Sequence, residues 1–140
     1  MALVLDSGVL IAALVGDDPA HHACKQLLES ATEHLLIPDP VLVEVDFLIR
    51  KTAPVETWLS FCEQIAEGAF DAFALTPTLV LRAARLQAKY SDFPLGFVDA
   101  AVFVTCEALG EPKVATLDRR HFSVLRTSEG AALDLLPARA

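Results

Sequence analysis

Cysteine is scarce in this chain, and its scarcity excludes two classes of small protein. The three cysteines, Cys24, Cys62 and Cys106, are odd in number and far apart in the sequence. A disulfide framework needs paired cysteines, and a zinc site needs ligands at short, regular spacings. We therefore expect small buried thiols at these positions.

Long uncharged apolar runs are also missing. No window of the sequence reaches the ~18 consecutive apolar residues of a membrane-spanning helix. The N-terminus lacks the basic flank and the cleavage site of a signal peptide. We therefore predict a cytoplasmic protein with no membrane association.

Basic residues are few, because 11 Lys and Arg stand against 19 Asp and Glu and give a net charge of −8. Neutralisation of phosphates by basic side chains supplies most non-specific affinity for nucleic acid, so this charge argues against a general nucleic-acid coat protein. It does not exclude a nuclease, whose substrate phosphate can be bound by a metal ion and a local basic strip. The acidic remainder of the chain also leaves room for a basic protein partner.

The 140 residues contain no linker, repeat or low-complexity segment, which predicts a single domain over residues 1–140. Apolar runs typical of strands alternate with capped segments typical of helices. Strands are predicted at residues 2–5, 35–37, 70–75, 113–117 and within 132–136, and helices at 7–14, 18–31, 38–50, 54–68, 76–90 and 95–109. This alternation predicts an α/β fold whose parallel sheet is covered on both faces.

Four carboxylates lie beside or within the most apolar segments of the chain, where a folded protein tolerates charge least. They are Asp6 after the first strand, Glu44 within residues 40–45, Asp99 within residues 95–104, and Asp118 after residues 114–117. Burying an unpaired carboxylate costs several kcal/mol, so something must compensate these charges. A divalent cation is the economical compensator, since Mg²⁺ prefers carboxylate oxygens and water. A metal ion held by clustered acids also cleaves phosphodiesters.

The predicted fold gives these four carboxylates a place to meet. In open parallel sheets, ligands bind outside the carboxyl ends of the strands. Asp6 and Asp118 are the first residues after predicted strands, and Glu44 and Asp99 lie near the beginnings of helices that start at the same edge. All four side chains can therefore converge.

Simpler structural roles remain open for three of the four. Asp6 could be a helix N-cap, Asp118 the cap of the turn that follows it, and Glu44 the partner of a buried arginine. Asp99 is the hardest to explain in this way. It is the only charge before Glu107 in a helix that is apolar nearly all round.

Four segments of the chain, in order, resemble the motifs of the PIN domain and, within that family, of the VapC-type toxin ribonucleases of toxin-antitoxin pairs. They are residues 5–11, 40–45, 95–101 and 115–122, so the resemblance extends over nearly the whole chain. Gly8 stands where the family often has Ser or Asn. The resemblance implies a PIN-like three-layer sandwich with a central, mostly parallel sheet flanked by helices.

The resemblance also implies the active site and the activity. It makes Asp6, Glu44, Asp99 and Asp118 the catalytic acids, with Asp6, Asp99 and Asp118 binding Mg²⁺ or Mn²⁺ and with Ser7 in a supporting role. The implied activity is Mg²⁺-dependent endoribonucleolytic cleavage of structured RNA, either tRNA or rRNA, by metal-activated water. The implied partners are a cognate antitoxin protein and a second copy of the chain. The hydrophobic content of 54% favours such a homodimer, because it exceeds what a small monomer normally hides.

Basic side chains supply candidate contacts to RNA. Arg82 and Arg85, followed by Lys89, share one face of their predicted helix, although a solvated face or a contact with a partner would place them in the same way. Arg119 and Arg120, followed by His121, come directly after Asp118 and are better placed to touch a phosphate beside a metal ion.

Four alternative functions can be compared with this prediction. A housekeeping PIN nuclease would share the site but not the toxin role. An acidic-site phosphotransferase or phosphatase of the haloacid-dehalogenase type needs a second Asp two positions after the first, where this chain has Gly8, and a receiver-like phosphoacceptor needs a late Lys, where it has Asp118. A binding domain without activity would carry neutral residues in place of the four acids.

Overall fold

The computed structural model describes residues 1–138. Five strands form one sheet in the order β3-β2-β1-β4-β5, and each neighbouring pair is parallel. The strands are β1 (Ala2–Leu5), β2 (His34–Pro38), β3 (Asp71–Phe73), β4 (Lys113–Ala115) and β5 (Asp134–Leu136). The helices are α1 (Ser7–Leu14), α2 (His21–Ser30), α3 (Asp39–Ile49), α4 (Val55–Ala66), α5 (Pro77–Lys89), α6 (Phe97–Leu109) and α7 (Arg119–Phe122).

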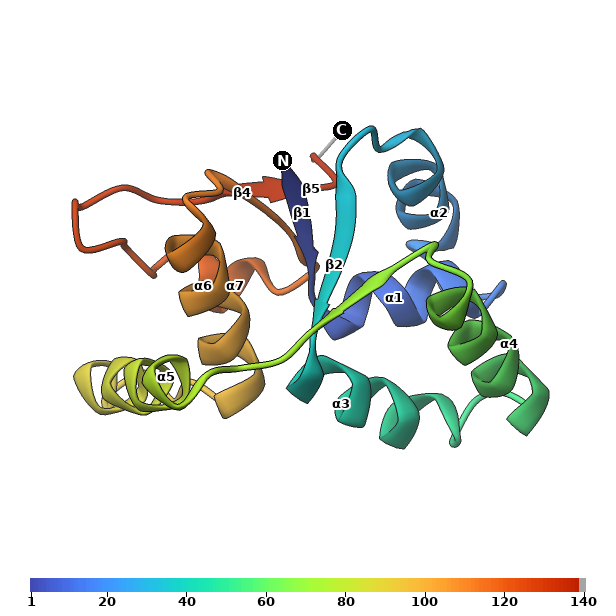
Figure 1. Cartoon of the computed structure of the whole chain (residues 1–140), viewed down its shortest axis with the longest axis horizontal. Coiled ribbons are helices and arrows are strands. Elements are labelled where there is room, and N and C mark those ends of the chain that lie inside the picture. The colour runs from blue at the N-terminus through green and yellow to red at the C-terminus, as the bar shows by residue number, and fades with distance from the viewer. Residues whose placement is uncertain (139–140) are drawn as a thin grey trace.

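Helices flank the sheet on both sides, with α1 to α4 on one side and α5 to α7 on the other (Figure 1). Sheets covered on both faces have strands that are apolar throughout, and Leu3, Val4 and Leu5 of the central β1 are all buried. The predicted three-layer α/β sandwich is confirmed. The three cysteines are free thiols, of which Cys24 and Cys106 are buried and Cys62 is partly buried.

Two local predictions differ from the structure. The helix predicted over residues 18–31 begins only at His21, so Asp18 lies before α2 and does not cap it. The Asp18 carboxylate instead accepts a hydrogen bond from the Ala20 N–H at 2.8 Å, and the backbone carbonyl of Asp18 accepts one from the His21 N–H at 2.9 Å. Residues 18–21 therefore form a turn before the helix. Strand β4 also ends early, at Ala115, and Asp118 lies three residues beyond it.

The strand order contains a switch point between β1 and β4. From β1 the chain steps outward to β2 and then β3, and from β3 it crosses back to β4 and continues to β5. Connections therefore leave β1 and β4 toward opposite faces and open a crevice at the carboxyl ends of these strands, where ligands bind in such sheets. Asp6 follows β1 and Asp118 follows β4, so both flank this crevice.

Helix α6 is buried along most of its length. Its residues 100–106 are all buried, and Gly110 ends it in the left-handed conformation with φ of 67°. Asp99 lies in its first turn. Within residues 1–138, none of the helices combines the length and the apolar character needed to cross a membrane.

Candidate active site

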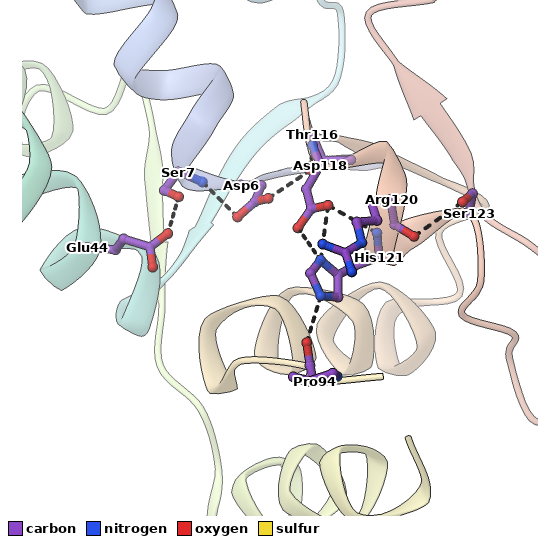
Figure 2. A network of polar contacts seen from close by, with 9 residues as sticks. All are labelled: Asp6, Ser7, Glu44, Pro94, Thr116, Asp118, Arg120, His121 and Ser123. Atoms are coloured by element: carbon purple, nitrogen blue, oxygen red, sulfur yellow. Dashed lines mark hydrogen bonds and ion pairs between the residues drawn. The ribbon is translucent and has the colours of Figure 1, made fainter. Parts of the chain in front are cut away.

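Asp6 is held rigidly at the end of β1. It is only 4% exposed, and it caps α1 because one carboxylate oxygen accepts the Ser7 N–H at 2.8 Å. The other oxygen accepts a hydrogen bond from the Thr116 hydroxyl, also at 2.8 Å. Asp6 therefore does cap a helix, as the sequence left open, and it also lies at the switch point of the sheet (Figure 2).

Thr116 connects the two strands of the crevice, and sequence reasoning did not single it out. Its buried hydroxyl donates to Asp6 and accepts the Asp118 N–H at 3.0 Å. The sequence did contain an indication of this role, because Thr116 is a polar residue inside the apolar run of residues 114–117. Its contact with Asp6 cannot be predicted without the pairing of β1 with β4, which brings Leu5 opposite Ala115.

Glu44 lies on α3 and is connected to the site by a hydrogen bond with Ser7. The Ser7 hydroxyl donates a hydrogen bond to the Glu44 carboxylate, which joins the beginning of α1 to α3 (Figure 2). Within residues 1–138 Glu44 forms no ion pair with Arg or Lys, so the buried-arginine alternative does not apply.

Asp118 and His121 form a pair at the start of α7. Asp118 caps this short helix by accepting the His121 N–H at 3.0 Å, and His121 Nδ1 lies 2.9 Å from its carboxylate. His121 Nε2 lies 2.7 Å from the Pro94 carbonyl oxygen. Since a carbonyl only accepts, this nitrogen carries a hydrogen and donates. The imidazole thus links Asp118 to the loop that precedes α6.

Asp99 faces Asp118 from the first turn of α6. One ligand atom from each of Asp99, Asp118 and His121 can be chosen so that all three lie within 4.8 Å of one another. Both ring nitrogens of His121 are already engaged, so we assign this residue to the orientation of Asp118 rather than to ligation. Burial, reinforced by the carboxylates of Asp6 and Asp118, raises the pKa of Asp99 to about 7.

The pKa of Asp6 responds to the same neighbours. Burial raises it, the hydrogen bonds from Thr116 and Ser7 lower it, and the charges of Glu44 and Asp118 raise it again. The structure therefore brings together all four carboxylates that the sequence singled out. Within residues 1–138 none of the four pairs with Lys or Arg. His121, beside Asp118, is the one basic partner of this group of four carboxylates within the same residues, and such an excess of carboxylate oxygens fits a hard divalent cation.

Metal-free stability should depend on pH through Asp99. The pKa of Asp99 is about 7 in the folded chain against an ordinary value of 3.8, so the folded chain holds this proton more tightly than the unfolded chain does. The corresponding stability is complete below the lower value and is lost as pH rises toward about 7. We expect Asp99→Asn to gain stability over the wild type across this window when both are unfolded thermally in EDTA. A difference between the two proteins that is constant with pH would rule out this origin.

The arginines proposed to contact RNA lie outside the carboxylate cluster. Arg119 donates to the Pro137 carbonyl at 2.6 Å. Arg120 is exposed and lies 5.3 Å from the centre of the Phe93 ring, whose other contact is His121 at 4.8 Å between ring centres. Arg120 is thus beside the site, whereas the guanidinium of Arg119 is directed to the C-terminal segment.

A parallel sheet with a cluster of four carboxylates at its switch point defines an α/β protein with an acidic candidate site. The chain belongs to the PIN domain family, whose model matches residues 3–126. Ribonuclease VapC26 of Mycobacterium tuberculosis is 30% identical over 135 residues, which cover 96% of this chain and 100% of the relative. Within the family, the chain is therefore of the VapC type.

Solved structures with the same fold include three from toxin-antitoxin systems. VapC20 of Mycobacterium tuberculosis, described as a toxin that cleaves the sarcin-ricin loop, has a TM-score of 0.72 at 19% identity over 81% of this chain and 87% of its own. A toxin-antitoxin complex from Klebsiella pneumoniae gives 0.67 at 20% identity over 88% and 92%. VapBC2 from Rickettsia felis, bound to a promoter DNA fragment, gives 0.68 at 13% over 96% and 98%.

Proposed function

We propose that this chain is a Mg²⁺-dependent endoribonuclease and the toxin of a toxin-antitoxin pair, acting in the cytoplasm, with Mn²⁺ able to replace Mg²⁺. The observation that carries the proposal is the convergence of four carboxylates with no Lys or Arg paired to them within residues 1–138. The membership of this chain in the PIN family and its 30% identity to Ribonuclease VapC26 support the same function.

In this proposal Asp6, Asp99 and Asp118 hold the cation, and Glu44 is the fourth catalytic carboxylate. When bound, the cation supplies an activated water and neutralises charge on the reacting phosphate. Thr116 and the Ser7 N–H fix the two oxygens of Asp6, and His121 fixes Asp118. These hydrogen bonds orient the carboxylates in advance, which reduces the cost of ordering them when substrate binds.

Ser7 has two separate functions in the same site. Its backbone N–H donates to Asp6, while its hydroxyl donates to Glu44. We assign it the supporting role of keeping these two carboxylates in place. Cleavage by a water molecule needs no protein nucleophile, so the Ser7 hydroxyl is free to serve in this way.

The proposed substrate is structured RNA, either tRNA or rRNA. VapC20, which shares the fold, is described as cleaving the sarcin-ricin loop. Arg120 is a candidate for contact with the phosphate next to the cleaved one because it lies beside the site, and Arg119 is a weaker candidate. Mapping the 5′ ends of cellular RNA after a pulse of expression identifies the RNA and the cleaved bond.

The proposal includes two protein partners, a cognate antitoxin and a second copy of the chain. Structural neighbours include a toxin-antitoxin complex and a VapBC assembly. Val43 and Phe47 of α3 are 73% and 52% exposed, and Val55 and Leu59 of α4 are 67% and 58% exposed. Exposed apolar side chains on two consecutive helices are typical of protein interfaces and support association with a partner.

The experiment that tests the proposed activity compares two substrates during titration with Mg²⁺ or Mn²⁺. We expect structured RNA to be cleaved only when the cation is present and cleavage to cease in EDTA, while p-nitrophenyl phosphate remains intact. Cation-dependent turnover of p-nitrophenyl phosphate without cleavage of RNA would favour the phosphotransferase or phosphatase alternative and reject the nuclease.

A further inference from the structure

A basic groove lies between α5, α6 and the segment that follows α7. It has a volume of about 240 Å³. Its lining includes four basic side chains, Arg82, Arg85, Lys89 and Arg126, and two apolar ones, Leu86 and Val104. Three separate segments of the chain therefore contribute to one concave surface, which distinguishes it from a solvated helix face.

Most of the positive charge of this groove is uncompensated. Glu107 is the acidic residue that lines it, and this side chain pairs with Arg82 at 3.3 Å. Arg85 and Lys89 are exposed, and within residues 1–138 neither forms an ion pair. Arg126 donates to the carbonyls of Ser123 and Leu125, which position its guanidinium without neutralising it.

The charge of the whole chain is distributed unevenly around this groove. Residues 17–71, which form α2 to α4, contain 11 acidic and 3 basic residues. Residues 72–138 contain 7 acidic and 7 basic residues, although two of the four active-site carboxylates are among them. A polyanion is therefore repelled by the α2–α4 segment but not by the α5–α7 segment, and its attraction is confined to the basic groove itself.

Helix packing connects the groove to the carboxylates. Arg82 contacts Glu107 near the end of α6, and the Gln87 amide donates to the Leu95 carbonyl just before α6 begins, at 3.0 Å. Helix α5 is thus antiparallel to α6. Val104 lies about 7.5 Å further along the axis of α6 than Asp99 and is turned by about 140° around the helix from it. The contact of Gln87 with Leu95 places the end of α5 that carries Lys89 beside the start of α6, where Asp99 lies. An RNA chain that extends beyond a phosphate at Asp99 would pass this end of α5 to reach the groove.

We propose that this groove binds the RNA backbone beside the cleaved phosphate, an inference that rests on the proposed endoribonuclease function. A phosphate chain matches both the excess of basic side chains and the continuity with the acidic site. A basic protein partner does not, because like charges would face each other across the groove. Arg85 and Lys89 are assigned direct phosphate contacts.

The test uses the double variant Arg85→Gln/Lys89→Gln, because both side chains are exposed and form no ion pair with any residue of 1–138. The matched control is Lys25→Gln/Lys51→Gln, which removes the same charge from the acidic side of the chain. Binding of a fluorescein-labelled RNA stem-loop is measured by anisotropy over a range of salt concentrations. Both pairs of changes are made in an Asp99→Asn chain, so that the RNA stays intact.

We expect the double variant to bind RNA on the order of 10-fold more weakly at low salt. The slope of log K against log salt should fall by about 1.4, since each lost phosphate contact on a single strand contributes ~0.7. The control should change neither quantity. In chains with Asp99 intact, the double variant should raise KM for RNA cleavage and leave kcat unchanged.

Each contrary result has its own meaning. Unchanged RNA affinity and salt slope in the double variant, with cleavage by the wild type intact, would overturn the groove and leave the proposed function standing. Loss of binding to the protein encoded immediately upstream, with RNA binding unchanged, would assign the groove to that partner and overturn the RNA assignment. Failure of the wild type to cleave RNA at all would remove the proposed function and this inference together.

Discussion

Asp99→Asn is expected to lower the rate of RNA cleavage by about 10³-fold while the chain stays folded. The change removes one of the carboxylates proposed to hold the cation, whose charge stabilisation of the reaction amounts to several kcal/mol, at 1.36 kcal/mol per tenfold in rate. Asn has the shape of the protonated acid, which burial and the neighbouring carboxylates already favour. Cleavage assays in Mg²⁺, with thermal unfolding in EDTA, measure the two effects separately.

The stability of the Asn variant carries as much information as its activity. Removal of a partly buried negative charge should maintain or raise the stability of the metal-free chain at neutral pH. The matched control is Asp134→Asn, which makes the same change in charge at an exposed residue of β5, opposite Lys113 at the beginning of β4 and so at the other end of that strand from the site. Full Mg²⁺-dependent activity in the Asp99 variant would show that the site has been assigned wrongly.

Expression of this chain alone is expected to arrest growth, and co-expression with the open reading frame immediately upstream is expected to relieve the arrest. We propose that the upstream product is a small antitoxin that places an Arg or Lys near Asp6 and Asp99. Their uncompensated charge favours such a basic side chain. A segment that is disordered before binding could wrap the exposed apolar residues of α3 and α4 at the same time.

The purified pair allows a sharper form of this prediction. Inhibition of cleavage should weaken as Mg²⁺ rises, because the cation and the basic side chain compete for the same carboxylates. Expression of Asp99→Asn alone should be harmless and provides the control for burden from the protein itself. If the active chain is also harmless in the cell while the purified protein cleaves RNA, a housekeeping nuclease is the better description.

The sequence predicted the layout of this site because its main signals are local. Apolar runs ending in Asp6 and near Asp118, and an apolar helix carrying Asp99, need no knowledge of distant contacts. The alternation of strands and helices implies a parallel sheet, and a parallel sheet places these positions at one edge. The convergence of the four carboxylates follows from this arrangement, as the shared effects on the pKa values of Asp6 and Asp99 indicate.

The supporting hydrogen bonds could not be predicted in the same way, because they depend on pairings between distant segments. Thr116 meets Asp6 across 110 positions of sequence, and His121 meets Pro94 across 27. Both contacts require β4 to lie beside β1 and α7 to lie against the loop before α6. The turn at Asp18 was missed for a local reason, since the same Asp-Pro signal that opens a helix also forms a turn.

Direct measurement of cation binding tests the central claim that the four carboxylates form a metal site. Calorimetric titration of the wild type with Mn²⁺ at neutral pH should show saturable binding. Asp99→Asn should bind at least about 10-fold more weakly, whereas Asp134→Asn should match the wild type. Equal affinity in all three proteins, or no binding to the wild type, would contradict the assignment of this cluster as the catalytic centre.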